Sequence, residues 1–231
     1  SAFRNLRTLD LGTAKGLTAD LFNSISPETK SSIEDLDLGN RLTTGFDFSA
    51  FSNLKSLSLS ASNNLATEQL NSIPNKSSIE TLELIGCIRR FDFSGFRNLK
   101  TLNFKGSLGL SAEDFNTISP GVRASIETLQ LNTATNFDFS GFTNLKKLNF
   151  NGPGGAINLT TEQFNTLPVK VKASIESLQL NTATDFDFSG FTNLKKLRLN
   201  RSIGLTEAVF NTFPEEAKAS LETLSISSVT D

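Results

Sequence analysis

The sequence predicts an α/β fold in which about ten short parallel strands form one sheet. Three observations carry this prediction: an apolar strand pattern recurs ten times along the 231 residues, helical and extended connections alternate between its copies, and one charged column changes sign at every copy. The chain is therefore expected to build one continuous sheet.

The strand pattern is L-x-x-L-x-L, and in its last four positions, x-L-x-L, the apolar residues alternate with polar ones and face one side of the sheet. It occurs in two forms that alternate along the chain. The form F-x-N-L-[RK]-x-L recurs at spacings of 48, 45, 46 and 49 residues, beginning at Phe3, Phe51, Phe96, Phe142 and Phe191. The form S-[IL]-E-x-L lies between these copies, with its first apolar residue at Ile33, Ile79, Ile126, Ile175 and Leu221. The structural period is therefore a pair of units.

The long connections of each pair are predicted to be helical. They cover residues 17–30, 65–76, 110–123, 159–172 and 205–218. In three of them a hydroxyl side chain stands where a helix N-cap is expected, at Thr18, Ser111 and Thr160, and an acidic residue follows in the first turn. A proline ends the first helical piece of each connection. One helical phenylalanine per connection is expected to pack inward, at Phe22, Phe115, Phe164 and Phe210.

The short connections carry F-D-F-S-[AG]-F and are predicted to be extended or turn-like. They cover residues 46–51, 91–96, 137–142 and 186–191. Phenylalanines two positions apart cannot share one face of a helix, but they do share one face of an extended chain. Stacked copies are expected to form a spine of rings, so the 20 Phe residues are interpreted as core.

The recurring L-x-x-L-x-L strands resemble those of the leucine-rich-repeat family, and the L-T-x-E-x-F stretches are similar to the helical unit of its ribonuclease-inhibitor-like and cysteine-containing repeat classes. The resemblance implies a right-handed solenoid, shaped as a horseshoe or arc, with the strands on the concave face and helices alternating with extended segments on the convex face. One departure is that small residues such as Ala14 and Cys87 mostly replace the asparagine that many members place after the strand. Cys87 is therefore interpreted as a buried residue.

Residues 1–231 are expected to form a single leucine-rich-repeat domain. Ser1 aligns with Ser49 of an interior unit, and Thr230-Asp231 aligns with Thr184-Asp185, so both chain ends fall inside repeats. Because such arrays need polar terminal repeats for solubility, the domain is expected to be a fragment of a longer array without its caps.

The residue types argue against catalysis. The chain has no His, the commonest general base and metal ligand, and Cys87 is its only cysteine. No phosphate-binding, zinc-protease or nucleophile-elbow motif occurs, and the cluster Gly152-Pro153-Gly154-Gly155 is interpreted as a loop insertion. We expect a protein that is not an enzyme, with no catalytic, cofactor-binding or metal-binding residues and no cofactor.

Charge and hydropathy limit the partners. The net charge is -2, with 22 basic and 24 acidic residues, which does not favour nucleic-acid binding. No apolar run approaches the roughly 18 residues of a membrane span, so membrane insertion is not expected. The single cysteine leans toward an intracellular location, but secretion or surface display stays open.

One column of the repeat, here called the charge ladder, alternates in sign at every step. Its members share the second position of the strand pattern and are Arg7, Glu34, Lys55, Glu80, Lys100, Glu127, Lys146, Glu176, Lys195 and Glu222. Equivalent positions on neighbouring parallel strands lie about 4.8 Å apart, so each charge is expected between two opposite ones. The ladder is interpreted as structural, because it favours the correct strand order.

The concave face is expected to carry the residues that alternate with the strand leucines. The third and fifth positions of the pattern grade from acidic to basic along the chain. The candidate partner-binding residues in these columns are Asp10, Asp35, Asp37, Glu83, Asn103, Gln130, Lys147, Asn149, Gln179, Lys196 and Arg198. The absence of Tyr and Trp removes the usual interface anchors, which favours an electrostatically guided contact.

These observations favour a non-enzymatic recognition module that binds a protein partner through the concave sheet. Two alternatives stay open. One is a structural or self-assembling array in a surface or coat, because an acidic start and a basic end permit head-to-tail self-association. The other is the substrate-recognition region of a larger enzyme or effector whose catalytic domain lies outside this sequence.

Overall fold

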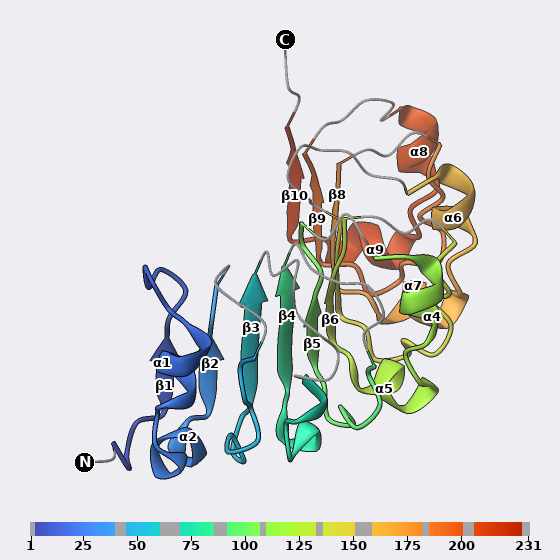
Figure 1. The fold of residues 1–231 in the computed structure, drawn as a ribbon. Coiled ribbons are helices and arrows are strands. Elements are labelled where there is room, and N and C mark those ends of the chain that lie inside the picture. The colour runs from blue at the N-terminus through green and yellow to red at the C-terminus, as the bar shows by residue number, and fades with distance from the viewer. Residues whose placement is uncertain are drawn as a thin grey trace.

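The computed structural model describes residues 3–39, 45–60, 70–85, 92–106, 110–132, 136–150, 159–181, 185–200 and 206–227. Within these ranges the chain forms ten strands, eight short α-helices and one 3-10 helix. The strands lie in one all-parallel sheet in chain order. Figure 1 shows the row of strands from β1 (blue) to β10 (red), with α4 to α9 along one side of it. The predicted α/β fold with ten parallel strands is confirmed.

Each strand begins at the third position of the L-x-x-L-x-L pattern. The strands are β1 (Thr8–Asp10), β2 (Asp35–Asp37), β3 (Ser56–Ser60), β4 (Thr81–Ile85), β5 (Thr101–Asn103), β6 (Thr128–Gln130), β7 (Lys147–Asn149), β8 (Ser177–Leu180), β9 (Lys196–Leu199) and β10 (Thr223–Ile226). Leucine pairs with leucine at every junction, from Leu9 opposite Leu36 to Leu197 opposite Leu224. The columns read from the sequence are thus the true register of the sheet, since a slip by one residue would turn the leucines to the other face.

The long connections form pairs of short helices. The helices are α1 (Ala19–Asn23), α2 (Pro27–Ser32), α4 (Ala112–Asn116), α5 (Pro120–Ser125), α6 (Thr161–Asn165), α7 (Val169–Ser174), α8 (Glu207–Asn211) and α9 (Glu215–Ser220), with the 3-10 helix η1 at Lys76–Ser78. The predicted caps are confirmed, because Thr18, Ser111 and Thr160 each accept a hydrogen bond from the amide three residues later. The proline does not itself end the first helix, which stops three or four residues earlier. It stands at or just before the start of the second helix, where the missing N–H removes no intrahelical hydrogen bond.

The core is a layer of strand leucines covered by phenylalanine rings. Phe22 of α1 is fully buried and stacks between Phe46 and Phe51 of the following extended segment, at ring-centroid distances of 4.5 and 5.6 Å. Phe115 and Phe164 occupy the same place in α4 and α6, with distances of 4.3 and 5.6 Å and of 4.2 and 5.3 Å. The extended segments therefore close the side of the sheet on which the helices lie.

The ring spine is not uniform along the chain. Leu70, buried like the helical phenylalanines, takes their place in the second long connection. The inward packing predicted for Phe210 is wrong: its side chain is 36 % exposed, and Val209 is the buried residue of α8. Phe210 differs from Phe22 because no F-D-F-S segment follows it in the described part of the chain.

The F-D-F-S segments are extended and turn-like, as predicted. In each one the aspartate folds back onto the chain, as when Asp47 Oδ1 accepts a hydrogen bond of 2.8 Å from the Ser49 amide. The same bond recurs at Asp92, Asp138 and Asp187. A short polar side chain that bonds the backbone two residues later is typical of turns, which explains why aspartate recurs between the two buried rings.

Two interpretations lie outside the described residues, namely the buried Cys87 and the loop at 152–155. Among the described helices, none is long and apolar enough to cross a membrane.

Candidate interaction surface

The face of the sheet away from the helices is formed by the third and fifth positions of each unit, and is called the open face below. Leucines at the alternate positions point into the core, so these polar side chains point outward. Asp10, Asp35, Lys147, Lys196 and Arg198 are exposed. The remaining predicted residues except one are half-buried, namely Asp37, Glu83, Gln130, Asn149 and Gln179.

Asn103 is the exception, because it is only 5 % exposed and offers almost no surface to a partner. Its Oδ1 accepts a 2.9 Å hydrogen bond from the Lys105 amide, and its Nδ2 donates to Glu83 Oε1 at 3.4 Å. These two bonds join the side chain to the backbone after β5 and to Glu83 of β4. Asn103 is therefore a structural residue rather than a contact residue, which corrects the expectation from its column.

The acidic half of the open face brings carboxylates side by side. Asp10 and Asp37 are register partners on β1 and β2. Each uses one oxygen to cap the end of its strand, because Asp10 Oδ1 accepts from Gly12 N and Asp37 Oδ1 from Gly39 N, at 2.9 and 2.8 Å. The other oxygens form no salt bridge with the described residues. Like charges directly opposite each other destabilise a sheet.

The two glycines are required at this place. Gly39 has a positive φ of 50°, and a Cβ there would lie 2.4 Å from the backbone of Gly12. The two D-L-G turns therefore pack directly on each other, which holds the two carboxylates together at the end of the sheet. Substituting Gly39 would move both strand ends.

The basic half of the open face carries Lys147, Lys196 and Arg198 on β7 and β9. All three are exposed, and none forms a salt bridge with a described residue. Ser177 of β8 separates the two lysines in the register, which keeps the cations about two strand spacings apart. The open face thus has an acidic end at β1 and β2 and a basic end at β7 to β9, as the sequence predicted.

The charge ladder runs along the edge where the strands begin. Its backbone is regular, since each member's amide donates to the carbonyl of the previous member, as from Lys55 to Glu34 at 2.7 Å and from Glu222 to Lys195 at 2.8 Å. The first six members line a polar groove of about 690 Å³. The ladder is thus a continuous feature of one sheet edge.

The sequence predicts that each ladder charge pairs equally with its neighbours on both sides, but the structure shows salt bridges mainly on one side of each glutamate. Each glutamate except Glu222 bonds the cation of the next strand: Lys100 to Glu80 at 2.8 Å, Lys146 to Glu127 at 2.8 Å, Lys195 to Glu176 at 2.9 Å, and Lys55 to Glu34. Only Glu34 also bonds the cation before it, Arg7. The hydrogen bond from Lys146, followed by its positive charge, lowers the pKa of Glu127, and the same bond raises the pKa of Lys146.

Buried cations on the helix side were not anticipated from the sequence. Lys30, Arg123 and Lys172 end the long connections and are 3 to 5 % exposed. The guanidinium of Arg123 lies 5.7 Å from the centre of the Phe142 ring, bonds Asp138 at 2.6 Å and donates to three backbone carbonyls. Arg123 is therefore fully partnered, which makes it a structural residue.

The two buried lysines are held less tightly. Lys172 lies over Phe164 and Phe191, donates to the Asn165 carbonyl at 3.0 Å and is 3.9 Å from Asp187. Burial lowers the pKa of Lys172, and the charge of Asp187 partly opposes this. A basic residue recurs at this position in every long connection, and that recurrence was the signal available in the sequence.

No group of three or more His, Cys, Asp or Glu residues suited to a metal ion occurs in the described ranges. A scan against protein-family models finds no match, and a search of curated proteins finds no relative.

Proposed function

We propose that this chain is a leucine-rich-repeat solenoid of the ribonuclease-inhibitor-like or cysteine-containing type, and that it acts as a non-enzymatic module that binds a protein partner across its open face. The paired units, the all-parallel sheet and the helices on one side support the solenoid. In that architecture the open face is the concave surface.

The observation that carries the binding proposal is the separation of charge on the open face. Asp10 and Asp37 stand opposite each other without a cation in salt-bridge contact among the described residues, and Lys147, Lys196 and Arg198 likewise lack an anion. The ladder at the strand edge shows the opposite arrangement, because there each cation bonds a glutamate. A surface with like charges next to each other binds most favourably to a partner that supplies the opposite charges.

The partner fitting this face has a basic patch opposite β1 and β2 and an acidic patch opposite β7 to β9. Parallel strands hold the charged columns rigidly before binding, so little ordering entropy is lost on the side of this protein. The chain has no Tyr or Trp to fill partner pockets, so charge pairs are expected to set the association rate more than the dissociation rate.

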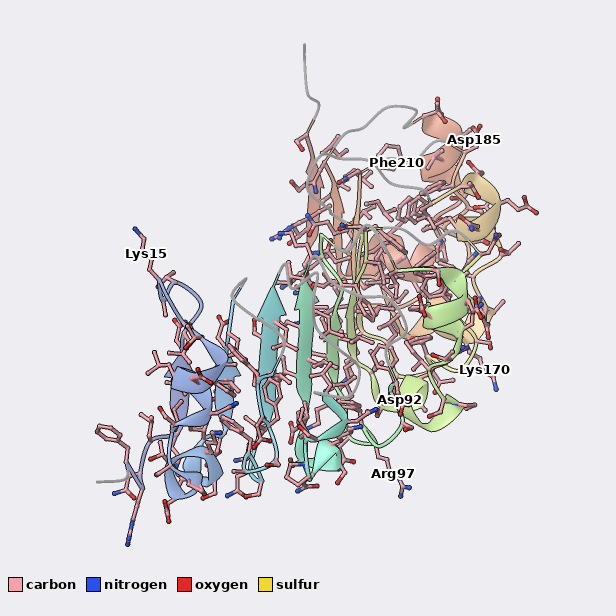
Figure 2. All side chains as sticks on the ribbon, viewed as in Figure 1. Lys15, Asp92, Arg97, Lys170, Asp185 and Phe210 are labelled. Carbon is pink, nitrogen blue, oxygen red and sulfur yellow. The ribbon has the colours of Figure 1, made fainter. Side chains whose placement is uncertain are left out.

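The test compares two variants that both fold like the wild type. The triple variant Lys147→Glu, Lys196→Glu, Arg198→Glu reverses the basic end of the open face, and Lys170→Glu changes an exposed cation on α7, where Figure 2 shows the side chain pointing away from the sheet. A partner captured with the wild-type chain is identified, and its binding kinetics are then measured at two salt concentrations. The triple variant should slow association and flatten its salt dependence, while Lys170→Glu should match the wild type. Loss of binding in the Lys170 variant with the triple variant unchanged would place the contact on the helix side.

A further inference from the structure

The part of the open face over β6 to β9 is basic and rich in hydrogen-bond donors. None of the third- and fifth-position residues of these four strands is acidic. The ladder glutamates at the edge of these strands bond ladder lysines, at 2.8 and 2.9 Å, so they do not neutralise the open face. The donors of this surface, called the basic platform below, belong to Gln130, Lys147, Asn149, Gln179, Lys196 and Arg198.

The two lysines of the basic platform stand at a fixed interval. Lys147 on β7 and Lys196 on β9 both pair with Ser177 of β8 in the register of the sheet. Neighbouring strands lie about 4.8 Å apart, so the backbones that carry the two lysines are about 9.6 Å apart. Arg198 follows Lys196 on the same face of β9, two residues later. The platform thus presents one cation on β7 and two on β9.

A row of side-chain amides lies beside the lysines. Gln130, Asn149 and Gln179 are consecutive register partners on β6, β7 and β8, and Arg198 continues the row on β9. The three amides are half-buried and Arg198 is exposed. Each carboxamide and the guanidinium carry N–H groups that can donate. A ligand that crosses the strands along this row therefore meets a donor at every strand.

We infer that the basic platform binds a protein segment in the polyproline II conformation with acidic side chains three residues apart. The inference rests on the proposed function, because it specifies the acidic patch of the partner. A polyproline II segment has three residues per turn and rises about 3.1 Å per residue. Side chains i and i+3 therefore point the same way about 9.3 Å apart, which matches the interval between Lys147 and Lys196. The second acid also meets Arg198.

The amide row favours this backbone over the two regular alternatives. The carbonyls of a polyproline II segment form no hydrogen bonds within the segment, so they accept from Gln130, Asn149 and Gln179. An α-helix places residues i and i+7 about 10.5 Å apart, but most of its carbonyls already accept bonds inside the helix. A β-strand repeats its side chains on one face at about 6.7 and 13 Å, and neither interval matches the two lysines.

Two synthetic peptides of identical composition test the spacing. Both have capped ends and an N-terminal fluorophore. The first is P-P-D-P-P-D-P-P, in which the aspartates are three residues apart, and the second is P-P-D-P-D-P-P-P, in which they are two apart and point in different directions. The proline background favours polyproline II in both. Fluorescence anisotropy should give at least about threefold tighter binding of the first peptide, because the second loses one charge pair.

Variants of the chain place the contact. Lys147→Gln and Lys196→Gln should each bind the two peptides equally, since either change leaves one lysine and removes the interval. Lys170→Gln, the same substitution at an exposed position of α7, should keep the wild-type preference. Circular dichroism checks that all three variants fold.

No binding of the first peptide, or equal affinity of the wild type for both peptides, would overturn the inference. The proposed function would still stand if the triple charge reversal slowed association of the captured partner. A trinucleotide with two phosphates that binds as tightly as the first peptide would also overturn the inference, because the platform would then bind anions in general. A spacing preference that survives in Lys147→Gln and in Lys196→Gln would do the same.

Discussion

Replacing Phe139 by alanine tests whether the ring clusters of the short connections hold the fold together. Phe139 is 5 % exposed and contacts three other rings, Phe115 at 5.6 Å, Phe142 at 6.1 Å and Phe150 at 6.3 Å. These neighbours come from α4, from its own segment and from the residue after β7. The side chain therefore joins a helix, an extended segment and the sheet.

The expected loss follows from this burial. Truncating a buried phenylalanine to alanine lowers the free energy of unfolding by about 3 to 5 kcal/mol. Each aromatic pair contact contributes about 0.5 to 1.5 kcal/mol, and Phe139 has three of them. We therefore expect a loss of about 4 kcal/mol, near the middle of the first range. For a chain of 231 residues, this corresponds to a melting temperature lowered by about 8 to 16 °C.

Thermal unfolding followed by circular dichroism measures the shift, and hydrogen exchange locates it. Exchange should accelerate first in α4, β6 and β7, because units of a repeating structure contact mainly their neighbours. Phe139→Leu keeps most of the apolar volume and should lose less stability. Leu21→Ala, at a side chain that is 58 % exposed, should change stability by about 0.5 kcal/mol or less. Equal melting temperatures for Phe139→Ala and Leu21→Ala would refute the assignment of Phe139 to the core.

Two further predictions concern the charge ladder. Lys100→Glu removes the salt bridge to Glu80 and puts a third carboxylate between Glu80 and Glu127, so the melting temperature should fall. The fall should be larger at low salt, because salt screens exposed charges. A melting temperature equal to that of the wild type at low ionic strength would contradict this. The hydrogen bond from Lys146 lowers the pKa of Glu127 below 4.5, so the stability it contributes is fully present above pH 4.5 and is lost as the pH falls through the lower, folded-state pKa. Acid titration of unfolding should therefore be less steep in Glu127→Gln than in the wild type, and identical curves would rule out this contribution.

The sequence by itself determined the strands, their order and their register. Leucines such as Leu9 and Leu36 alternate with polar residues inside a longer repeat, and a slip by one residue would turn them all to the other face of the sheet. The helix caps were equally readable, because the hydroxyl of Thr160 bonds an amide only three residues away. Features of this kind depend on neighbouring residues or on the repeat itself.

The tertiary structure alone decided which members of a column are buried and which are partnered. Asn103 lies in an outward-facing column but is buried, because it bonds the backbone of its own strand end. Phe210 is exposed, since no ring segment follows it in the described chain. Arg123 is buried because Phe142 and Asp138, which come from the next unit, enclose it. The same residue type in the same repeat position thus meets different surroundings, since burial and charge pairing depend on side chains that the adjacent unit contributes.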